Sequence, residues 1–444
     1  MLNESHLPDL RSWIESANDG VTDFPIQNLP YGVFRRRGSD EAWRVGVAIG
    51  SMILDVDAVH RLGFVDGAAA AAATTCASPS LNGLMSLGPE AWTALRRALS
   101  RLLRADTPTG RMAMARAPVL LVAQSDAELH LPASVGDYSD FYASVFHATN
   151  VGSMFRPDQP LLANYKWIPI GYHGRASSLV VSGTPITRPT GQIGGTPGEA
   201  PTVGPTARLD YEAELGLFVG RGNPIGEPIA IGDAAGHLFG MTLLNDWSAR
   251  DIQAWEYQPL GPFLAKSFAT SLSPWVVTFE ALAPYRCPAF ARPVGDPAPL
   301  PYLADAGDQA HGGLDIAIEV WIRTARMRAA SEPAVRLSRG NARDLYWTMA
   351  QLLTHHSSGG CNLQPGDLLG SGTISGAERE SRGCLLELTW RGDEPVALPN
   401  GEARRFLEDG DEVILRGLCS ADGRPHLGFG DCTGVVRAAV TSSF

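Results

Sequence analysis

Lysine is nearly absent from this 444-residue chain. Only Lys166 and Lys266 occur among its 36 lysines and arginines, so arginine supplies almost all of the positive charge. An arginine presents a planar guanidinium fork, whereas a lysine presents a compact ammonium. A lysine that is kept in such a chain therefore indicates a position that needs the smaller cation.

An excess of positive charge is also missing, since the formal net charge is −11 at pH 7. Nucleic acid and anionic membrane surfaces attract basic proteins, so we expect neither as a partner. No apolar run approaches the ~20 residues that a membrane-crossing helix needs. The first residues, MLNESHLPDLRSW, lack a basic stretch followed by an apolar core, so we expect no secretory signal.

Paired cysteines and two common catalytic motifs are absent as well. The six cysteines are scattered without a CxxC pair, which favours reduced core residues of a cytoplasmic protein over disulfides or a zinc site. There is no G-x-S-x-G elbow and no P-loop, so serine-hydrolase and nucleotide-binding functions have no support. The cysteines are Cys76, Cys287, Cys361, Cys384, Cys419 and Cys432.

The composition that remains, 44% hydrophobic and 19% charged, is typical of a large globular protein. We expect two domains, 1–130 and 131–444, divided near the proline that ends PVLLVAQSDAELHLPA. In the first domain, FPIQNLPYGVFRR and AWRVGVAIGSMILDVDAV predict short strands with a turn at Gly50-Ser51. PEAWTALRRALSRLLRA predicts a helix.

The second domain is rich in strand patterns and poor in helices, which argues against a doubly wound parallel sheet. Glycine and proline content predicts a loop over 193–206, and NARDLYWTMAQLLTHHSS predicts an amphipathic helix. Strands are predicted in YKWIPIGYHGRASSLVVSGTPITRP, LDYEAELGLFVG, PWVVTFEAL, LDIAIEVWIRT, GDLLGSGTISG, CLLELTW, DEVILRGLC and GFGDCTGVV.

The segment NDWSARDIQAWEYQPLGPFLAKSFAT, residues 245–270, concentrates polar and ionisable groups. On a helix that begins at Asp246, the residues Asp246, Arg250, Gln253 and Tyr257 would share one face. Lys266 follows after a proline and glycine break. The segment is interpreted as part of an active site, with a solvated helix face and ordinary salt bridges as the alternative.

A candidate metal site begins with Glu212 and Glu214, which share one face of the strand predicted in LDYEAELGLFVG. Two carboxylates so close repel each other unless a cation neutralises them, although a solvent-facing polar strand is the alternative. Asp246 and Asp140 complete a set of four carboxylates. Such an oxygen-only set suits Ca²⁺ or Mg²⁺ rather than zinc.

His147 is the best candidate for a general base among the ten histidines, because its ordinary pKa lies near neutrality. It lies seven residues after Asp140, which would place both on one side of a helix. Glu387 sits between apolar residues and needs a buried partner. That partner is either an imidazole that Glu387 orients or an arginine in a salt bridge. The tandem His355 and His356 are expected to cap or pack.

Taken together, these segments resemble the fumarylacetoacetate hydrolase family, over about residues 137–434 and more weakly over the N-terminal part. The resemblance implies a β-rich α+β fold, with an N-terminal SH3-like β-barrel followed by a C-terminal mixed β-roll, assembled as a homodimer. The motifs are DYSDFYASVFHATNVG, GYHGRASSLVVSGTP, LDYEAELGLFVG, FGMTLLNDWSARDIQAWEYQPLGPFLAKSF, YWTMAQLLTHHSSGGCNLQPGDLLGSGTISG and DGDEV with GFGDC.

The resemblance also implies roles for individual residues. His147 matches the base that activates water, and Glu387 matches its orienting acid. The implied ligands of a catalytic Ca²⁺ or Mg²⁺ are Asp140, Glu212, Glu214 and Asp246. The groups implied to stabilise the oxyanion and the leaving carbanion are Arg250, Gln253 and Lys266. The implied substrate contacts are Tyr142, Arg156, Tyr172, Gln253, Tyr257 and Thr373.

A second, structural magnesium is implied near Lys266 and Thr270, although this chain has Ala269 where a glycine is expected. The implied reaction is hydrolysis of a C–C bond in 4-fumarylacetoacetate, a small diketo acid, to fumarate and acetoacetate in tyrosine and phenylalanine breakdown. Related chemistry on the same ion, acylpyruvate hydrolysis or oxaloacetate decarboxylation, is the nearer alternative. A non-catalytic calcium-binding or scaffolding protein is the more distant one.

Overall fold

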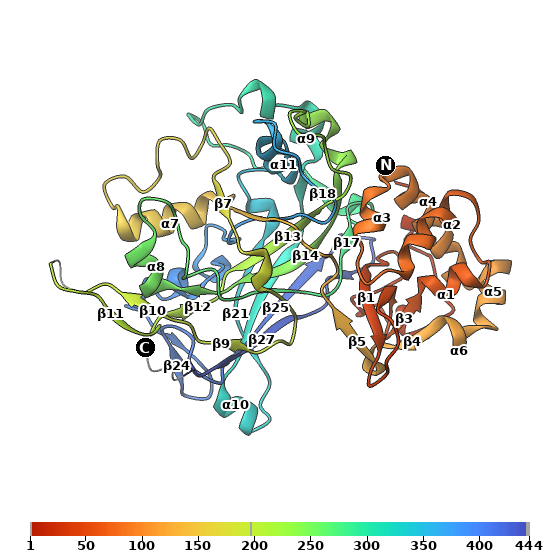
Figure 1. Cartoon of the computed structure of the whole chain (residues 1–444), viewed down its shortest axis with the longest axis horizontal. Coiled ribbons are helices and arrows are strands. Elements are labelled where there is room, and N and C mark those ends of the chain that lie inside the picture. The colour runs from red at the N-terminus through yellow and green to blue at the C-terminus, as the bar shows by residue number, and fades with distance from the viewer. Residues whose placement is uncertain (1, 196–197, 441–444) are drawn as a thin grey trace.

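The computed structural model describes residues 2–195 and 198–440 (Figure 1). The N-terminal part, red to orange in Figure 1, contains a five-stranded antiparallel sheet in the order β4–β3–β2–β1–β5. The predicted turn at Gly50-Ser51 is confirmed, because Ile49 and Met52 pair across it. The strands are β1 (Tyr31–Arg36), β2 (Arg44–Ile49), β3 (Met52–Asp55), β4 (Leu121–Ala123) and β5 (Ala127–His130).

Helices accompany this sheet, and the predicted helix in PEAWTALRRALSRLLRA is confirmed as α4. It begins at Pro89, a first-turn position where proline's missing N–H costs nothing. Leu95, Leu99 and Leu102 form its buried face. The helices of this part are α1 (Val56–Arg61), α2 (Gly67–Thr74), α3 (Asn82–Ser86), α4 (Pro89–Leu103), α5 (Pro108–Met114) and α6 (Ala117–Leu120).

The larger part of the chain contains an eight-stranded sheet in the order β7–β6–β22–β13–β14–β16–β8, with β17 also paired to β14. Most of its neighbours are antiparallel, but β6–β22 and β8–β16 are parallel. The strands are β6 (Tyr138–Phe141), β7 (Gly171–His173), β8 (Leu179–Val181), β13 (Ala213–Val219), β14 (Leu238–Asp246), β16 (Thr270–Leu272), β17 (Val277–Thr278) and β22 (Leu368–Gly370).

A six-stranded sheet in the order β21–β20–β25–β27–β9, with β26 paired to β25, completes the β-rich architecture. Its neighbours are antiparallel apart from the parallel pair β9–β27. The expectation that the fold is not a doubly wound parallel sheet is confirmed. The strands are β9 (Ile186–Thr187), β20 (Ala317–Arg323), β21 (Val335–Asn341), β25 (Glu412–Cys419), β26 (Leu427–Gly428) and β27 (Cys432–Arg437).

Short ribbons and helices join these sheets. The ribbons pair β10 (Thr190–Ile193) with β11 (Thr202–Pro205), β12 (Leu209–Asp210) with β15 (Ser248–Ala249), β18 (Arg286–Cys287) with β19 (Gly313–Leu314), and β23 (Val396–Ala397) with β24 (Ala403–Arg404). The helices are α7 (Val145–Phe155), α8 (Arg250–Glu256), α9 (Ala306–His311), α10 (Ala325–Ala329), α11 (Met349–Ser357) and α12 (Leu385–Leu388).

Three sequence-based expectations fail in this part. The loop predicted over 193–206 contains β11, because its residues pair with β10 in a hairpin; positions 196–197 of that prediction lie outside the described residues. The predicted amphipathic helix begins only at Met349, where Thr348 and Gln351 form a capping box. The six cysteines are free of disulfides as expected, but Cys361 is exposed rather than in the core.

One hydrophobic cluster contains residues of both the N-terminal sheet and the central strands of the eight-stranded sheet. Tyr31 and Trp92 approach Phe239, with ring centroids 6.0 and 5.2 Å apart, and Tyr31 forms a β-bridge with Val276. The same cluster includes Phe218 on β13, Leu244 on β14, Leu272 on β16 and Leu368 on β22. These strands are thus packed from behind by the first part of the chain. Among the described helices, none is long and apolar enough to cross a membrane.

Candidate active site

Four buried carboxylates converge at one end of neighbouring strands in the eight-stranded sheet. Asp140, Glu212, Glu214 and Asp246 each offer an oxygen, and these oxygens lie within 4.8 Å of one another. Asp140 is on β6, Glu214 on β13 and Asp246 at the end of β14, while Glu212 directly precedes β13. The alternative of a solvent-facing strand is excluded, because all four side chains are buried.

Asp140 and Asp246 were predicted to lie on helices, but both lie on strands. Asp246 does not open a helix: it is the last residue of β14, and α8 begins four residues later at Arg250. Asp140 and His147 do not share a helix either, because Asp140 lies on β6 and His147 on α7. Neighbouring strands therefore bring the acids together, rather than one helical face.

The electrostatics of this cluster fit a divalent cation. Burial and the Asp246 charge raise the pKa of Asp140 to about 7, and burial with the Asp140 charge holds the pKa of Glu214 well above its ordinary value. Asp140 Oδ1 and Glu214 Oε1 are buried without a hydrogen-bond partner. Buried carboxylate oxygens without partners are costly, and an oxygen-coordinated cation such as Ca²⁺ or Mg²⁺ would satisfy both.

Two positively charged side chains, Lys266 and Arg250, border the four carboxylates. Lys266 Nζ donates to Glu212 Oε2 at 2.5 Å and to Asp246 Oδ2 at 2.6 Å. Arg250 Nη1 donates to Glu212 Oε1 at 2.7 Å, and its Nε donates to Asp210 at 2.9 Å. Burial alone would raise the pKa of Glu212, but Lys266 and Arg250 hold it below its ordinary value. A solvated face with ordinary salt bridges is therefore excluded for these residues, since both cations are buried.

His147 and Glu387 form a buried pair beside the carboxylates. His147 Nδ1 lies 2.6 Å from Glu387 Oε2, and nearby His147 lowers the pKa of Glu387 to about 2 against the opposing effect of burial. Glu387 is thus an acceptor only, so Nδ1 carries the proton of this hydrogen bond. The strand predicted for CLLELTW is wrong, because Leu385–Leu388 form the short helix α12.

The remaining site residues differ in how closely the structure joins them to the cluster. Tyr172 donates to Asp246 Oδ2 at 3.0 Å, and the Tyr142 ring stands edge-on to His147 at 5.3 Å. Gln253 accepts a hydrogen bond from Arg250 Nη1, and Thr270 donates to Asp246 Oδ1 at 2.8 Å.

In the part of the chain that the structure describes, Arg156, Thr373 and Tyr257 make no hydrogen bond to the four carboxylates. The Arg156 Nε and the Thr373 hydroxyl are buried without partners, so both have hydrogen-bonding capacity in reserve. Tyr257 directly follows α8, and among the described residues its only hydrogen bonds are backbone ones to Gln253 and Gly261.

The sequence analysis missed several residues that support this site. Asp210 anchors Arg250 and also accepts the backbone N–H groups of Leu385 and Leu386, which ties α12 to the cluster. Gly370 lets Asp140 approach β22, since a Cβ there would stand 2.4 Å from Asp140 Oδ1. The donors that hold Glu387 are Asn150, Ser375 and the Cys384 thiol. Only the strand position of Asp210, two residues before Glu212, offered a signal in the sequence.

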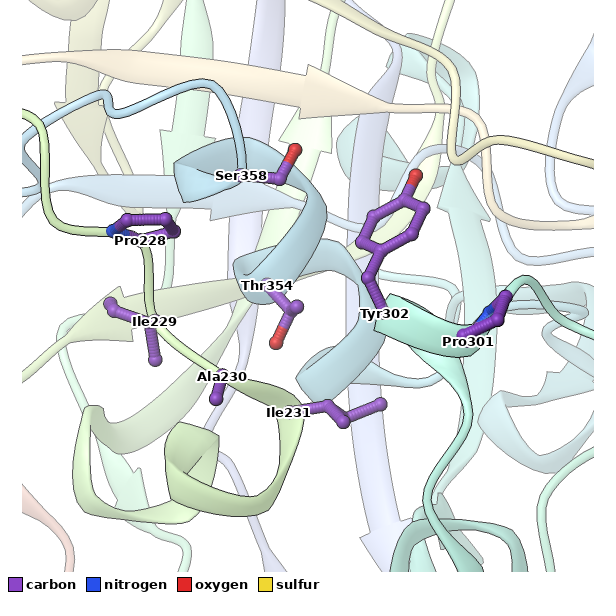
Figure 2. Close-up of a pocket in the computed structure, with 8 residues that line it drawn as sticks. All are labelled: Pro228, Ile229, Ala230, Ile231, Pro301, Tyr302, Thr354 and Ser358. Atoms are coloured by element: carbon purple, nitrogen blue, oxygen red, sulfur yellow. The ribbon is translucent and has the colours of Figure 1, made fainter.

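A separate pocket on α11 lacks the groups that this chemistry needs. Figure 2 shows it between the segment Pro228–Ile231, Tyr302, Thr354 on α11 and Ser358 directly after that helix. Its lining residues carry no charge, so it does not suit an anionic substrate. The neighbouring His355 and His356 pack as predicted, with His355 Nδ1 2.9 Å from the Tyr302 hydroxyl and His356 Nε2 2.7 Å from Ser139 Oγ.

A buried, oxygen-lined cation site beside an oriented imidazole, on a β-rich scaffold, defines the class of metal-assisted hydrolytic enzymes. The chain belongs to one family of that class, the fumarylacetoacetate hydrolase family. Residues 138–437 match the family described as fumarylacetoacetate (FAA) hydrolase C-terminal, and residues 27–132 match fumarylacetoacetase N-terminal.

Similar proteins extend over nearly the whole chain. It is 50% identical over 431 residues to a fumarylacetoacetase of Bos taurus, covering 97% of this chain and 99% of the relative. It is 49% identical over 433 residues to a fumarylacetoacetase of Homo sapiens, covering 97% and 100%. A solved fumarylacetoacetate hydrolase from Exiguobacterium antarcticum aligns with 17% identity and a TM-score of 0.49, covering 92% and 99%, a likeness too distant to carry an argument.

Proposed function

We propose that this chain hydrolyses the C–C bond of 4-fumarylacetoacetate to fumarate and acetoacetate, the last step of tyrosine and phenylalanine breakdown. The observation that carries the proposal is the position of the His147–Glu387 pair beside four buried carboxylates, two of which have unpartnered oxygens. The identity of about half of all positions to full-length fumarylacetoacetases supports this substrate.

Asp140, Glu212, Glu214 and Asp246 would hold Ca²⁺ or Mg²⁺. When bound, the cation would withdraw charge from the two ketone oxygens of the substrate. The choice between the two ions is part of the proposal.

A second magnesium near Lys266 and Thr270 is also proposed. The Lys266 ammonium, whose pKa is raised by the Asp246 and Glu212 charges against the effect of burial, has no lone pair to offer an ion. Such an ion would therefore need the Thr270 hydroxyl and backbone oxygens.

His147 begins the reaction by taking a proton from water at Nε2, while Glu387 stabilises the imidazolium through Nδ1–H. The resulting hydroxide adds to the ketone carbon of the fumaryl group, which becomes the new carboxyl of fumarate. Arg250 Nη2, which is buried without a partner, is free to donate to the oxyanion, with Gln253 and Lys266 beside it. The C–C bond then breaks, acetoacetate leaves as an enolate, and its carbon takes a proton.

Substrate contacts are proposed for Tyr142, Arg156 and Tyr172, together with Gln253, Tyr257 and Thr373. The unpartnered Arg156 Nε and Thr373 hydroxyl support this assignment, because a terminal carboxylate of the substrate would satisfy such donors. The finer architecture belongs to the same proposal: an SH3-like barrel over 1–130, a mixed β-roll over 131–444, a homodimer and a cytoplasmic location.

Turnover of fumarylacetoacetate, measured before and after a chelator and after Ca²⁺ or Mg²⁺ is returned, tests the proposal. We expect activity that the chelator removes and one of the ions restores. Acylpyruvate and oxaloacetate, assayed in parallel, should be much poorer substrates. Preferred turnover of either one, or full activity in chelator, would contradict the proposal.

A further inference from the structure

Lys166, the other lysine of the chain, lies outside the catalytic cluster. It follows α7 in the segment that leads to β7, and its ammonium forms an ion pair with Asp296. Asp296 is almost buried, with 8% of its side chain exposed, and it also accepts the Tyr346 hydroxyl at 3.2 Å. Two segments far apart in the sequence are therefore joined at this ion pair.

Arg292 makes a second contact with the backbone at Lys166. Arg292 Nη1 donates to the Lys166 carbonyl oxygen at 3.3 Å and to the Pro297 carbonyl oxygen at 2.7 Å. The guanidinium stacks over the rings of Tyr346 and Trp347, at 4.3 and 4.6 Å. The backbone at Lys166 is thus held by a side chain that is itself fixed between two aromatic rings.

Tyr165, the residue before Lys166, contacts Tyr142, which in turn contacts His147. Tyr165 is 2% exposed, and its hydroxyl donates to the Tyr142 carbonyl oxygen at 2.8 Å. The Tyr142 ring stands edge-on to Tyr165 at 5.9 Å and to His147 at 5.3 Å. A shift of the backbone at Lys166 would therefore move Tyr165 and, with it, the ring that borders His147.

We propose that Lys166 and Asp296 form a clasp that positions Tyr142 against His147 and against the bound substrate. Both are positioning residues, and the inference rests on the proposed function. Lys166 is 35% exposed, so we expect the pair to act on the geometry of the site more than on the free energy of unfolding. Because Tyr142 is a proposed substrate contact, displacement of its ring is expected to weaken substrate binding.

The test compares Lys166→Gln, Asp296→Asn and the double variant with the wild type. We expect KM for fumarylacetoacetate to rise about tenfold, the equivalent of ~1.4 kcal/mol, with kcat lowered less than about threefold. Calcium affinity and the midpoint of thermal unfolding should be unchanged. The double variant should resemble either single variant, because both remove one interaction. Lys166→Arg keeps the charge and should restore most of the wild-type KM.

Arg61→Gln is the matched control, since it removes an exposed ion pair with Asp57 on α1, in the N-terminal part. Unchanged KM in both single variants, losses that multiply in the double variant, or the same loss in the control would overturn the clasp. So would a failure of Lys166→Gln to fold, which would make the pair structural. An inactive wild-type protein would instead count against the proposed function.

Discussion

Lys266 shows at the scale of one residue why a compact cation is retained in a chain that otherwise uses arginine. Its ammonium fits between Glu212 and Asp246 at 2.5 and 2.6 Å, in a buried space. We expect Lys266→Arg to lower turnover by ~10²-fold or more, the scale of losing one oxyanion donor. The larger guanidinium would have to displace one of the two acids.

Steady-state kinetics of Lys266→Arg beside Lys166→Arg make the comparison, because the two changes are chemically identical. Lys166 is the partly exposed lysine, with 35% of its side chain accessible, so we expect it to accept the larger arginine side chain. Equal activities in the two variants would reduce Lys266 to an ordinary charge.

Glu387→Gln should slow hydrolysis by about 10²-fold or more without releasing the metal, a loss comparable to other broken base–orienter pairs. The amide keeps the shape of Glu387 but cannot stabilise the imidazolium of His147. His147→Ala should be similarly damaging, and the double variant little worse than either single one. Single-turnover rates and calcium titrations of all three variants measure this. Multiplying losses, or loss of calcium by Glu387→Gln, would refute the pairing.

At the scale of elements, β22 supports the proposed metal site through a residue that has no side chain. Gly370 pairs with Asp140 across the parallel strands, and an added Cβ would meet Asp140 Oδ1 at 2.4 Å. Gly370→Ala should therefore displace Asp140 and weaken calcium binding about 10–100-fold, the range for residues that support metal ligands. Calorimetric titration checks this, with Gly204→Ala as the control because its Cβ would meet nothing within 4 Å.

Sequence patterns located the site better than they described the elements that form it. The strand LDYEAELGLFVG alternates apolar and acidic residues, so the shared face of Glu212 and Glu214 was predictable. The helix expected from Asp246 was not there, since this residue ends β14 and pairs with Thr270 of β16. The i, i+4 spacing of polar residues fits a helix and a strand-to-helix junction equally well.

The same limit applies to Glu387 and to the unforeseen support residues. CLLELTW is apolar enough for a buried strand. The helix that forms within it, α12, has only four residues, which are too few for periodicity to separate strand from helix. Asn150 contacts Glu387 across 237 positions, and Asp210 contacts Leu385 across 175, so no local pattern carries these two contacts.

At the scale of the whole molecule, His6 links the two parts of the chain. Its Nδ1 accepts the Asn3 N–H at 3.0 Å, and its Nε2 donates to the Glu280 carbonyl oxygen at 2.8 Å. Burial and the Arg96 charge lower the pKa of His6 from its ordinary 6.5. The unfolded chain therefore binds a proton that the folded protein takes up only at lower pH.

Stability from His6 is thus present above about pH 6.5 and is lost as the pH falls toward the lowered pKa. Urea unfolding at pH 7.5 and 5.5 should show this loss in the wild type and a smaller one in His6→Gln. Identical pH dependence in both proteins would contradict the assignment. Burial lowers the pKa of other histidines in the same direction, so some loss should persist; they are His237, His355 and His356.

The hydrophobic cluster that joins the N-terminal sheet to the central strands has a consequence for synthesis on the ribosome. Tyr31 and Leu99 are made early, but their partner Leu368 emerges roughly tens of seconds later at ~5–20 residues per second. During that interval, the newly made first part exposes an apolar face. We expect ribosome-bound chains ending near residue 200 to bind a chaperone more strongly than chains ending near residue 400, and equal binding would argue against it.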